Sequence, residues 1–289
     1  MFSVWIRAAR PRTLVAAVVP VSVGICLALE SQLFLFPPAI LCMLFAILIQ
    51  IGTNFANDYY DYQKGADTLA RIGPRRAVAS GLILPAAMFR ATWITLGLAF
   101  LVGLGLLRYG GWILLLVGTV SILCALIYTG GPFPLAYLGL GDLFVVGFFG
   151  IVAVGFTHFV QSGFFSLDTY LAGLAVGLVV NNLLVVNNYR DVEEDRRCDK
   201  KTLAVRFGRK FSLWQFRLQT LGSCVCIAWM PTVDFRVWLL LVVILCLLGA
   251  KVSRQLDNAV TIKDFSVCLN TSALMVPVFG TILCIGILI

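Results

Sequence analysis

Long hydrophobic stretches alternate with short polar stretches along almost the whole chain. A helix that crosses a bilayer needs roughly 20 predominantly apolar residues, and about 17 to 25 are common. By this criterion the pattern predicts an all-α polytopic membrane protein with nine transmembrane helices in a single domain over residues 1–289. The predicted spans are Thr13–Leu29, Leu33–Phe55, Met88–Leu107, Trp112–Tyr128, Leu143–Phe159, Tyr170–Val186, Trp214–Met230, Phe235–Ala250 and Phe265–Ile289.

The composition supports an integral membrane protein rather than a soluble one. Of the 289 residues, 60% are hydrophobic and only 12% are charged, and no soluble domain needs so much apolar surface. The first hydrophobic stretch follows Arg7, Arg10 and Arg12, but no small-residue cleavage site comes after it. It is therefore interpreted as the first span and not as a cleavable signal peptide.

The basic residues predict the orientation in the membrane. With nine spans, 20 of the 22 Lys and Arg residues fall on the side of the N-terminus, and only Arg108 and Arg236 lie opposite. The positive-inside rule then places the N-terminus in the cytoplasm and the C-terminus on the opposite side of the membrane. The formal net charge of +8 follows from this bias, so it favours contact with membrane lipid and does not indicate nucleic-acid binding.

The cysteines and the single histidine give little sign of chemistry. Eight of the nine cysteines lie in or beside hydrophobic stretches, and there is no C-x-x-C pair, so they are interpreted as small buried hydrophobic residues. His158 falls near the membrane face opposite the acidic residues described next, where we expect it to be hydrogen-bonded and not catalytic.

Two polar motifs occur 133 positions apart, each at the end of a hydrophobic stretch. Asn54 and Asp58 are four residues apart, as are Asn187 and Asp191, and Asp61 and Asp195 follow within about a turn. The second and sixth spans run in the same direction, so both motifs emerge on the cytoplasmic side. The spacing also favours a parallel internal repeat of about four helices.

The two motifs together predict a divalent-metal site for a lipid-linked diphosphate. Carboxylate oxygens suit Mg²⁺, which binds through a few carboxylates together with substrate phosphates. An exposed acidic loop is more often a solvated turn, but polar groups at the ends of membrane helices are costly and tend to be functional. The predicted ligands, which are also the predicted catalytic residues, are Asp58, Asp61, Asp191 and Asp195, with Asp67 and Asp199 as further candidates.

Other polar side chains near the motifs are predicted to contact the substrates. Arginine suits bidentate binding of phosphate, and lysine acts as a point charge. For Arg75, Arg76, Arg209 and Lys210, topology or contact with lipid head groups explains the charge better, and Asp142 is interpreted as an ordinary acid at a helix start. The predicted substrate-binding residues are Asn54, Asn57, Lys64, Tyr128, Asn187, Asn188, Arg190 and Lys201.

At these residues the chain resembles the UbiA-type intramembrane prenyltransferase superfamily, most of all the 1,4-dihydroxy-2-naphthoate polyprenyltransferases of menaquinone biosynthesis. The chain departs from the superfamily pattern at two places. Gly65 stands where the first motif often has a third Asp, and Cys198-Asp199-Lys200 stands where a Gly often precedes the Lys of the Lys-x-Thr-Leu segment. The matching segments are ARPRTL from Ala9, NFANDYYDYQKGAD from Asn54, GPRRAV from Gly73, YTGGPFPLAYLGLGD from Tyr128, NNYRDVEED from Asn187 and KTLAVR from Lys201.

The resemblance implies a fold of nine helices around a central cavity and a Mg²⁺-dependent reaction. A polyprenyl diphosphate would lose its diphosphate, and the allylic cation would alkylate 1,4-dihydroxy-2-naphthoate with loss of CO₂, giving demethylmenaquinol. A sister enzyme with another acceptor (4-hydroxybenzoate or homogentisate) or a phytyl donor is the main alternative. An ion-coupled transporter would more often carry its acids near mid-membrane, and a structural scaffold has no need for paired motifs.

Overall fold

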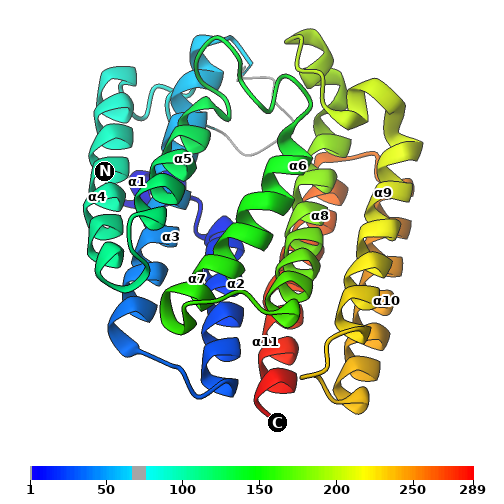
Figure 1. Cartoon of the computed structure of the whole chain (residues 1–289). Helices are drawn as coiled ribbons and strands as arrows, with labels where there is room; N and C mark the ends of the chain where they lie inside the picture. The colour runs from blue at the N-terminus through cyan, green and yellow to red at the C-terminus, as the bar shows by residue number, and fades with distance from the viewer. Residues whose placement is uncertain (1, 67–75) are drawn as a thin grey trace.

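The chain folds into a bundle of long helices (Figure 1). The computed structural model describes residues 2–66 and 76–289, which contain no strand; the chain is 81% helical. The elements are α1 (Phe2–Ala9), α2 (Pro11–Glu30), α3 (Phe36–Gln63), α4 (Pro85–Gly110), α5 (Ile113–Ile127), α6 (Gly141–Val145), the π-helix η1 (Val146–Val152), α7 (Ala153–Ser162), α8 (Leu167–Arg197), α9 (Leu203–Ala228), α10 (Phe235–Asp257) and α11 (Ile262–Leu288).

Seven of the helical segments in the described part of the chain are long and apolar enough to cross a membrane, with α6, η1 and α7 counted as one segment. Each of the nine predicted spans overlaps one helical segment, but α5 has only 15 residues. The helix α9 has 26 residues, but it is less apolar because it contains Arg206, Arg209, Lys210 and Arg217. The structure therefore confirms the all-helical membrane architecture and seven candidate spans.

The helices α3 and α8 continue well beyond their predicted hydrophobic ends. The sequence places the ends of these spans at Phe55 and Val186, whereas the helices run to Gln63 and Arg197. The extra turns contain the acids of both motifs, and because each motif lies on one continuous helix, the i, i+4 spacing places its polar residues on a shared helix face. Both ends lie at the same end of the bundle as the 128–140 loop (upper end of Figure 1).

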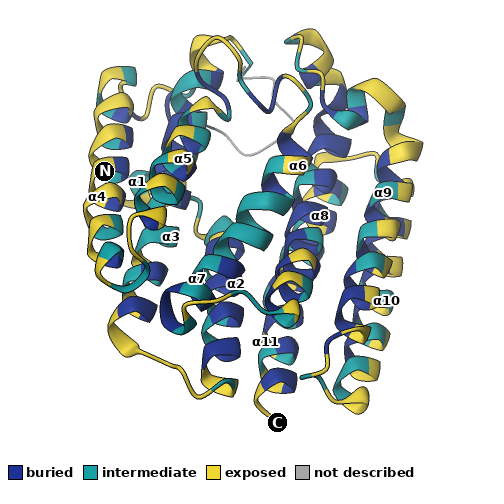
Figure 2. Cartoon of the chain, in the orientation of Figure 1, coloured by how far each residue is buried: buried dark blue, intermediate teal, exposed yellow. Residues whose placement is uncertain are grey.

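Burial follows the pattern of a protein that faces lipid. The largest core cluster joins α2 and α8 to the C-terminal helices α9 to α11. The outer faces keep large apolar side chains exposed, among them Leu101, Leu116, Leu218 and Leu247, and the exposed residues line the outside of the bundle in Figure 2. Such an exposed apolar surface is stable in the hydrocarbon of a bilayer and not in water.

Small residues allow η1 to pack closely against α8. A Cβ atom added at Gly150 would overlap the carbonyl oxygen of Gly173, and one added at Gly177 would lie 2.7 Å from the carbonyl oxygen of Val146. Close approach through glycines is a common way for membrane helices to associate, because lipid offers no hydrophobic driving force between them. The contact fixes the π-helix and the aromatic residues that it carries.

Candidate functional site

A cavity of about 310 Å³ opens between the helices of the N-terminal half, η1, α7 and α8. At one end it is lined by polar residues of the two motifs and their neighbours: Arg10, Asn54, Asn57, Tyr128 and Asn187. Away from this end its walls are mostly apolar. The cavity therefore combines a polar end, suited to a charged head group, with space for a hydrocarbon or aromatic ligand.

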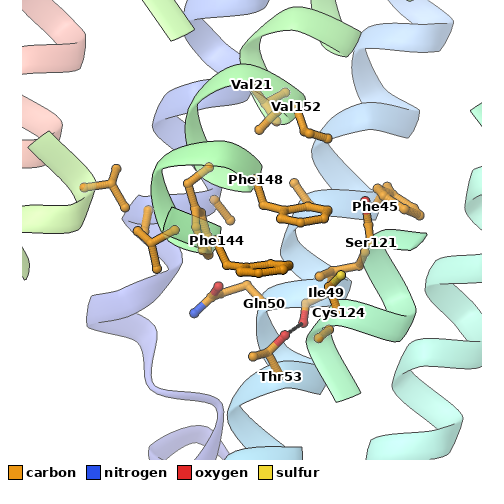
Figure 3. Close-up of a pocket in the computed structure, with 18 of the residues that line it drawn as sticks. Val21, Phe45, Ile49, Gln50, Thr53, Ser121, Cys124, Phe144, Phe148 and Val152 are labelled. Carbon is orange, nitrogen blue, oxygen red and sulfur yellow. Dashed lines mark hydrogen bonds between the residues drawn. The ribbon is translucent and has the colours of Figure 1, made fainter. Parts of the chain in front are cut away.

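Aromatic side chains from the π-helix region form one wall of this cavity (Figure 3). The rings of Phe144 and Phe148 are stacked, with centroids 5.9 Å apart and planes 10° apart, and we call this pair the phenylalanine wall. Figure 3 shows Gln50 and Ser121 among the residues that line the same pocket. A π-helical segment alters which side chains face inward and is frequently found at functional sites.

The two acids of the first motif make different contacts. Asp58 is buried, and its two oxygens accept hydrogen bonds from the backbone N–H groups of Ala77 and Val78, each at 3.1 Å. Asp61 accepts a hydrogen bond of 3.0 Å from the hydroxyl of Tyr137, and its other oxygen lies 3.9 Å from Arg76. Asp58 thus anchors the segment that leads into α4, whereas Asp61 faces the 128–140 loop.

The asparagines of the first motif hold neighbouring segments in place. The amide of Asn54 donates to the carbonyl oxygen of Ala9 at 2.9 Å and to the hydroxyl of Thr13 at 3.0 Å. Asn57 accepts a hydrogen bond of 2.8 Å from the hydroxyl of Thr129. Asn54 therefore ties the junction of α1 and α2 to α3, and Asn57 ties the loop after α5 to the same helix.

Lys64 sits directly at the end of α3 and bends back over the site. Its Nζ donates to the carbonyl oxygen of Thr129 at 2.6 Å and lies 4.3 Å from the ring centroid of Tyr137. Burial lowers the pKa of the Lys64 ammonium, and the charge of Asp61 opposes this effect. The side chain is therefore a partly desolvated cation beside an acid, which suits the binding of an anionic phosphate.

The second motif pairs each of its key acids with a cation. Asp191 and Arg190 form a two-point ion pair, with N–O distances of 2.5 and 2.7 Å, and both side chains are buried. Asp195 lies 3.3 Å from Nζ of Lys200. Asn187 donates to the carbonyl oxygen of Leu183 in its own helix and lines the cavity, and Asn188 is buried beside it.

Tyr137 lies between the two motifs. Burial, followed by the charge and hydrogen bond of Asp61 and the charge of Asp195, raises the pKa of its hydroxyl. Its ring is 5.7 Å from Nζ of Lys200, and its carbonyl oxygen accepts a hydrogen bond from the backbone N–H of Lys201. The 128–140 loop thus connects the ends of α3 and α8, which are far apart in the sequence.

The candidate ligands of the two motifs are carboxylates, which suits Mg²⁺. In the described structure the one sulfur ligand near them is the Cys198 thiol, and no imidazole lies beside them. Within residues 2–66 and 76–289, no three acidic, His or Cys side chains already converge on one point. The carboxylates are instead paired with basic side chains or accept hydrogen bonds from backbone N–H groups, and these partners compensate their negative charge.

The structure places several predicted residues differently from the sequence-based expectation. Lys201 and Asp199 are exposed and 3.7 Å apart, and Lys200 occupies the position beside the acids. Arg76, which we expected to serve topology or lipid contact, is largely buried and faces Asp61. The candidate ligand Asp67 and the neighbouring Arg75 lie outside the described residues.

Two further residues had weak sequence signals. Asp142, interpreted as an ordinary helix-start acid, is buried, and its Oδ1 accepts hydrogen bonds from Asn181 at 3.0 Å and Gln215 at 2.5 Å. The polar residues within the hydrophobic stretches of α8 and α9 were the signal for this network. For Tyr137 the signal was its place in the matching segment from Tyr128 to Asp142, but only the folded loop shows that it reaches Asp61.

The histidine is hydrogen-bonded, as predicted, and the prediction of buried cysteines holds for five of the eight. His158 is buried, and its Nδ1 lies within hydrogen-bond distance of the Phe164 carbonyl oxygen and of two neighbouring hydroxyl groups. All nine cysteines are free, and five of them are buried.

Arg209, another residue expected to serve topology or lipid contact, points back to α8. Its Nε donates to the carbonyl oxygen of Tyr189 at 3.3 Å, and its guanidinium carbon lies 5.5 Å from the centroid of the Tyr189 ring. Its contacts are therefore at least partly within the protein.

Comparison with known proteins gives a consistent result. Residues 17–271 match the UbiA prenyltransferase family. The 1,4-dihydroxy-2-naphthoate octaprenyltransferase of Mycobacterium tuberculosis is 38% identical over 233 residues, which cover 80% of each chain. The enzyme of the same name from Escherichia coli is 37% identical over 230 residues, covering 78% of this chain and 75% of that protein.

A solved structure shares the fold. The structure of a UbiA homolog from Archaeoglobus fulgidus bound to GPP and Mg²⁺ aligns with a TM-score of 0.68 at 14% identity, covering 97% of this chain and 99% of the other. The match to the family extends over most of the hydrophobic sequence and includes both acidic motifs. This chain therefore belongs to the UbiA prenyltransferase family.

Proposed function

We propose that this protein transfers a polyprenyl group from a polyprenyl diphosphate to 1,4-dihydroxy-2-naphthoate, releasing diphosphate and CO₂ and giving demethylmenaquinol. The relatives that are 36–38% identical over most of the chain bear the name of this activity. The structural observation that carries the proposal is the meeting of the two motifs at the polar end of an apolar cavity. The chain is thus an aromatic prenyltransferase of menaquinone biosynthesis.

The basic side chains at the polar end would bind the diphosphate of the donor. Lys64, Arg190 and Lys200 lie beside acids of the two motifs and carry the donors that phosphate oxygens require. They would stabilise the negative charge that develops as the C–O bond to the diphosphate breaks. The predicted contacts of Tyr128, Asn57 and Lys201 with substrate belong to the same proposal.

The apolar part of the cavity would protect the allylic cation. Water would capture such a cation, and the largely apolar lining leaves few positions where water is stable. The faces of the phenylalanine wall carry partial negative charge, which favours a neighbouring cation. The acceptor ring would then form the new C–C bond and lose its carboxylate as CO₂.

A divalent metal ion, Mg²⁺ in our proposal, would be held by Asp58, Asp61, Asp191 and Asp195, with Asp199 and Asp67 as outer candidates. The metal would supply positive charge to the departing diphosphate. Arg76, Arg190 and Lys200 now compensate three of these acids and would be available to the diphosphate once the metal takes over. Asp58 would also keep its second role of holding the backbone at Ala77 and Val78.

We also propose that the nine helical segments that overlap the predicted spans all cross the membrane, with α5 as a short span and α9 as a polar one. The N-terminus would lie in the cytoplasm, and the C-terminus would lie outside a bacterial inner membrane. The nearly complete separation of basic residues supports this arrangement. Both acidic motifs would then face the cytoplasm, where a soluble aromatic acid and a prenyl diphosphate are available.

An assay with purified protein tests the activity and the metal together. Polyprenyl diphosphate, Mg²⁺ and either 1,4-dihydroxy-2-naphthoate or 4-hydroxybenzoate are supplied, and kcat/KM is compared for the two acceptors. We expect the naphthoate to react far faster, and we expect EDTA to stop turnover and Mg²⁺ to restore it. Preference for 4-hydroxybenzoate would overturn the acceptor, and full turnover in EDTA would overturn the metal site.

A further inference from the structure

Arg10 has a position that the proposed reaction does not yet explain. It lies between α1 and α2, and it is the only charged residue among the described residues that line the cavity. Its backbone adopts the left-handed conformation, with φ 51° and ψ 69°, which is uncommon for a residue other than glycine. Such a conformation persists only where the surrounding structure holds it in place.

The surrounding hydrogen bonds fix this junction firmly. The carbonyl oxygen of Arg10 accepts from both the backbone N–H and the hydroxyl of Thr13, each at 2.9 Å. The same hydroxyl accepts from Asn54 at 3.0 Å and from Gln50 at 3.3 Å, and Asn54 also donates to the carbonyl oxygen of Ala9. Asn54 of the first acidic motif therefore positions Arg10 at the cavity.

We propose that Arg10 binds the carboxylate of the naphthoate acceptor and so holds the acceptor ring in the cavity against the phenylalanine wall. This inference rests on the proposed function, which supplies an acceptor with one carboxylate. An anion entering an apolar cavity needs a compensating partner, and a guanidinium offers a carboxylate two parallel hydrogen bonds. Gln50 and the stacked rings of Phe144 and Phe148 line the same cavity and would contact the aromatic ring and its hydroxyl groups.

The location of Arg10 relative to the first motif supports an acceptor role. Its guanidinium is close enough to Asp58 for the two charges to attract one another, and five N–H donors allow it to serve Asp58 and a ligand together. Lys64, Arg190 and Lys200 gather around Asp61 and the second motif, where the diphosphate is expected. Arg10 lines the cavity, whereas Lys64, Arg190 and Lys200 are not among its lining residues, so an acceptor held by Arg10 would lie inside the cavity, next to the diphosphate of the donor.

The same contact would help the product to leave. The transfer removes the carboxylate as CO₂, so the prenylated product no longer has the group that Arg10 binds. The product would then bind at Arg10 more weakly than the substrate does, which favours its release.

The test compares ligands that differ only in the carboxylate. Inhibition constants of 1-hydroxy-2-naphthoate and 1-naphthol against prenylation of 1,4-dihydroxy-2-naphthoate are measured for the wild type, Arg10→Gln, Arg10→Lys and Arg12→Gln. Arg12 is the matched control, because it is exposed, carries the same charge and contacts Asn270 away from the cavity. We expect the wild type and Arg12→Gln to prefer the carboxylate-bearing ligand by about 10- to 100-fold.

Arg10→Gln should lose this preference while KM for the prenyl diphosphate changes less than about twofold, and Arg10→Lys should keep part of it. If Arg10→Gln does not fold, Arg10→Lys decides the question by the same ratio. An unchanged preference, or a rise in KM for the diphosphate alone, overturns the role of Arg10. Failure of the wild type to prenylate the naphthoate overturns the proposed function instead, so the two failures are distinct.

Discussion

At the scale of single residues, the four predicted ligand acids are not equivalent. Asp61 and Asp195 flank Tyr137, where the two motifs meet, and Asp191 is paired with Arg190. Asp58 is turned toward the backbone of residues 77 and 78. Loss of charge at these positions should therefore affect catalysis and stability in different proportions.

For Asp61→Asn and Asp195→Asn, we expect prenyl transfer to fall by about 10²–10³-fold with little change in melting temperature. The amide keeps the shape of the side chain and an oxygen that accepts hydrogen bonds, but it removes the charge. The measurement is kcat at saturating Mg²⁺ and donor. Asp257→Asn is the matched control and should stay near the wild-type rate, since Asp257 is exposed at the end of α10. Near-normal turnover in both variants would exclude a shared site between the motifs.

Asp58→Asn should lower both activity and stability. The asparagine Nδ2 cannot accept a hydrogen bond, so one of the two backbone N–H groups, of Ala77 or of Val78, loses its partner. This loss costs about 1–3 kcal/mol. Thermal denaturation in detergent, run beside Asp61→Asn, measures the difference. Equal melting temperatures for the two variants would show that Asp58 does not anchor this segment.

At the scale of elements, the helices were predictable and their detailed geometry was not. The lengths of the hydrophobic stretches located all the long helices but not the short α1, because a helix buried in lipid requires a long apolar stretch. The π-helix η1 and the position of Tyr137 depend on contacts between segments, such as Gly150 with Gly173, that no local pattern encodes. The same limit explains why no local pattern showed that Lys200, and not the adjacent Lys201, lies beside Asp195.

The packing of η1 on α8 gives a prediction at this scale. Gly150→Ala would force η1 away from Gly173 and should lower the melting temperature, since overpacking typically costs about 1–3 kcal/mol. Gly147→Ala in the same π-helix is the control, because nothing lies within 4 Å of an added Cβ there. We also expect Gly150→Ala to lower kcat/KM, because Phe148 lies in η1 and Phe144 lies in α6, which continues directly into η1. Equal stability of the two variants would contradict the close helix contact.

At the scale of the whole molecule, the separation of basic residues predicts which side each end of the bundle faces. An odd number of crossings places the two termini on opposite sides of the membrane. Seven helical segments of the described structure meet the length and hydropathy criteria, and α5 and α9 decide whether the number of spans reaches nine. A residue at the end of α8 reports directly on the side that carries the acidic motifs.

Cys198 provides that report. A membrane-impermeant maleimide should label it in inside-out vesicles and not in intact cells, and Cys198→Ser should lose the label. Burial, together with the charge of Asp195, raises the pKa of this thiol, so less thiolate is present at neutral pH. Labelling should therefore be slow at pH 7 and rise about tenfold per pH unit until the pH reaches that pKa. Labelling in intact cells alone would reverse the orientation.

The size of the cavity also limits how far the protein can select its prenyl donor by chain length. At about 310 Å³ it is at the lower end of the range of about 300–1,000 Å³ that small-ligand pockets occupy, and the acceptor ring must share it. Most of a long isoprenoid would then extend into the bilayer among the lipid chains. The protein would then not select its donor by chain length. The tail length of the final quinone would be set earlier, by the enzyme that synthesises the polyprenyl diphosphate.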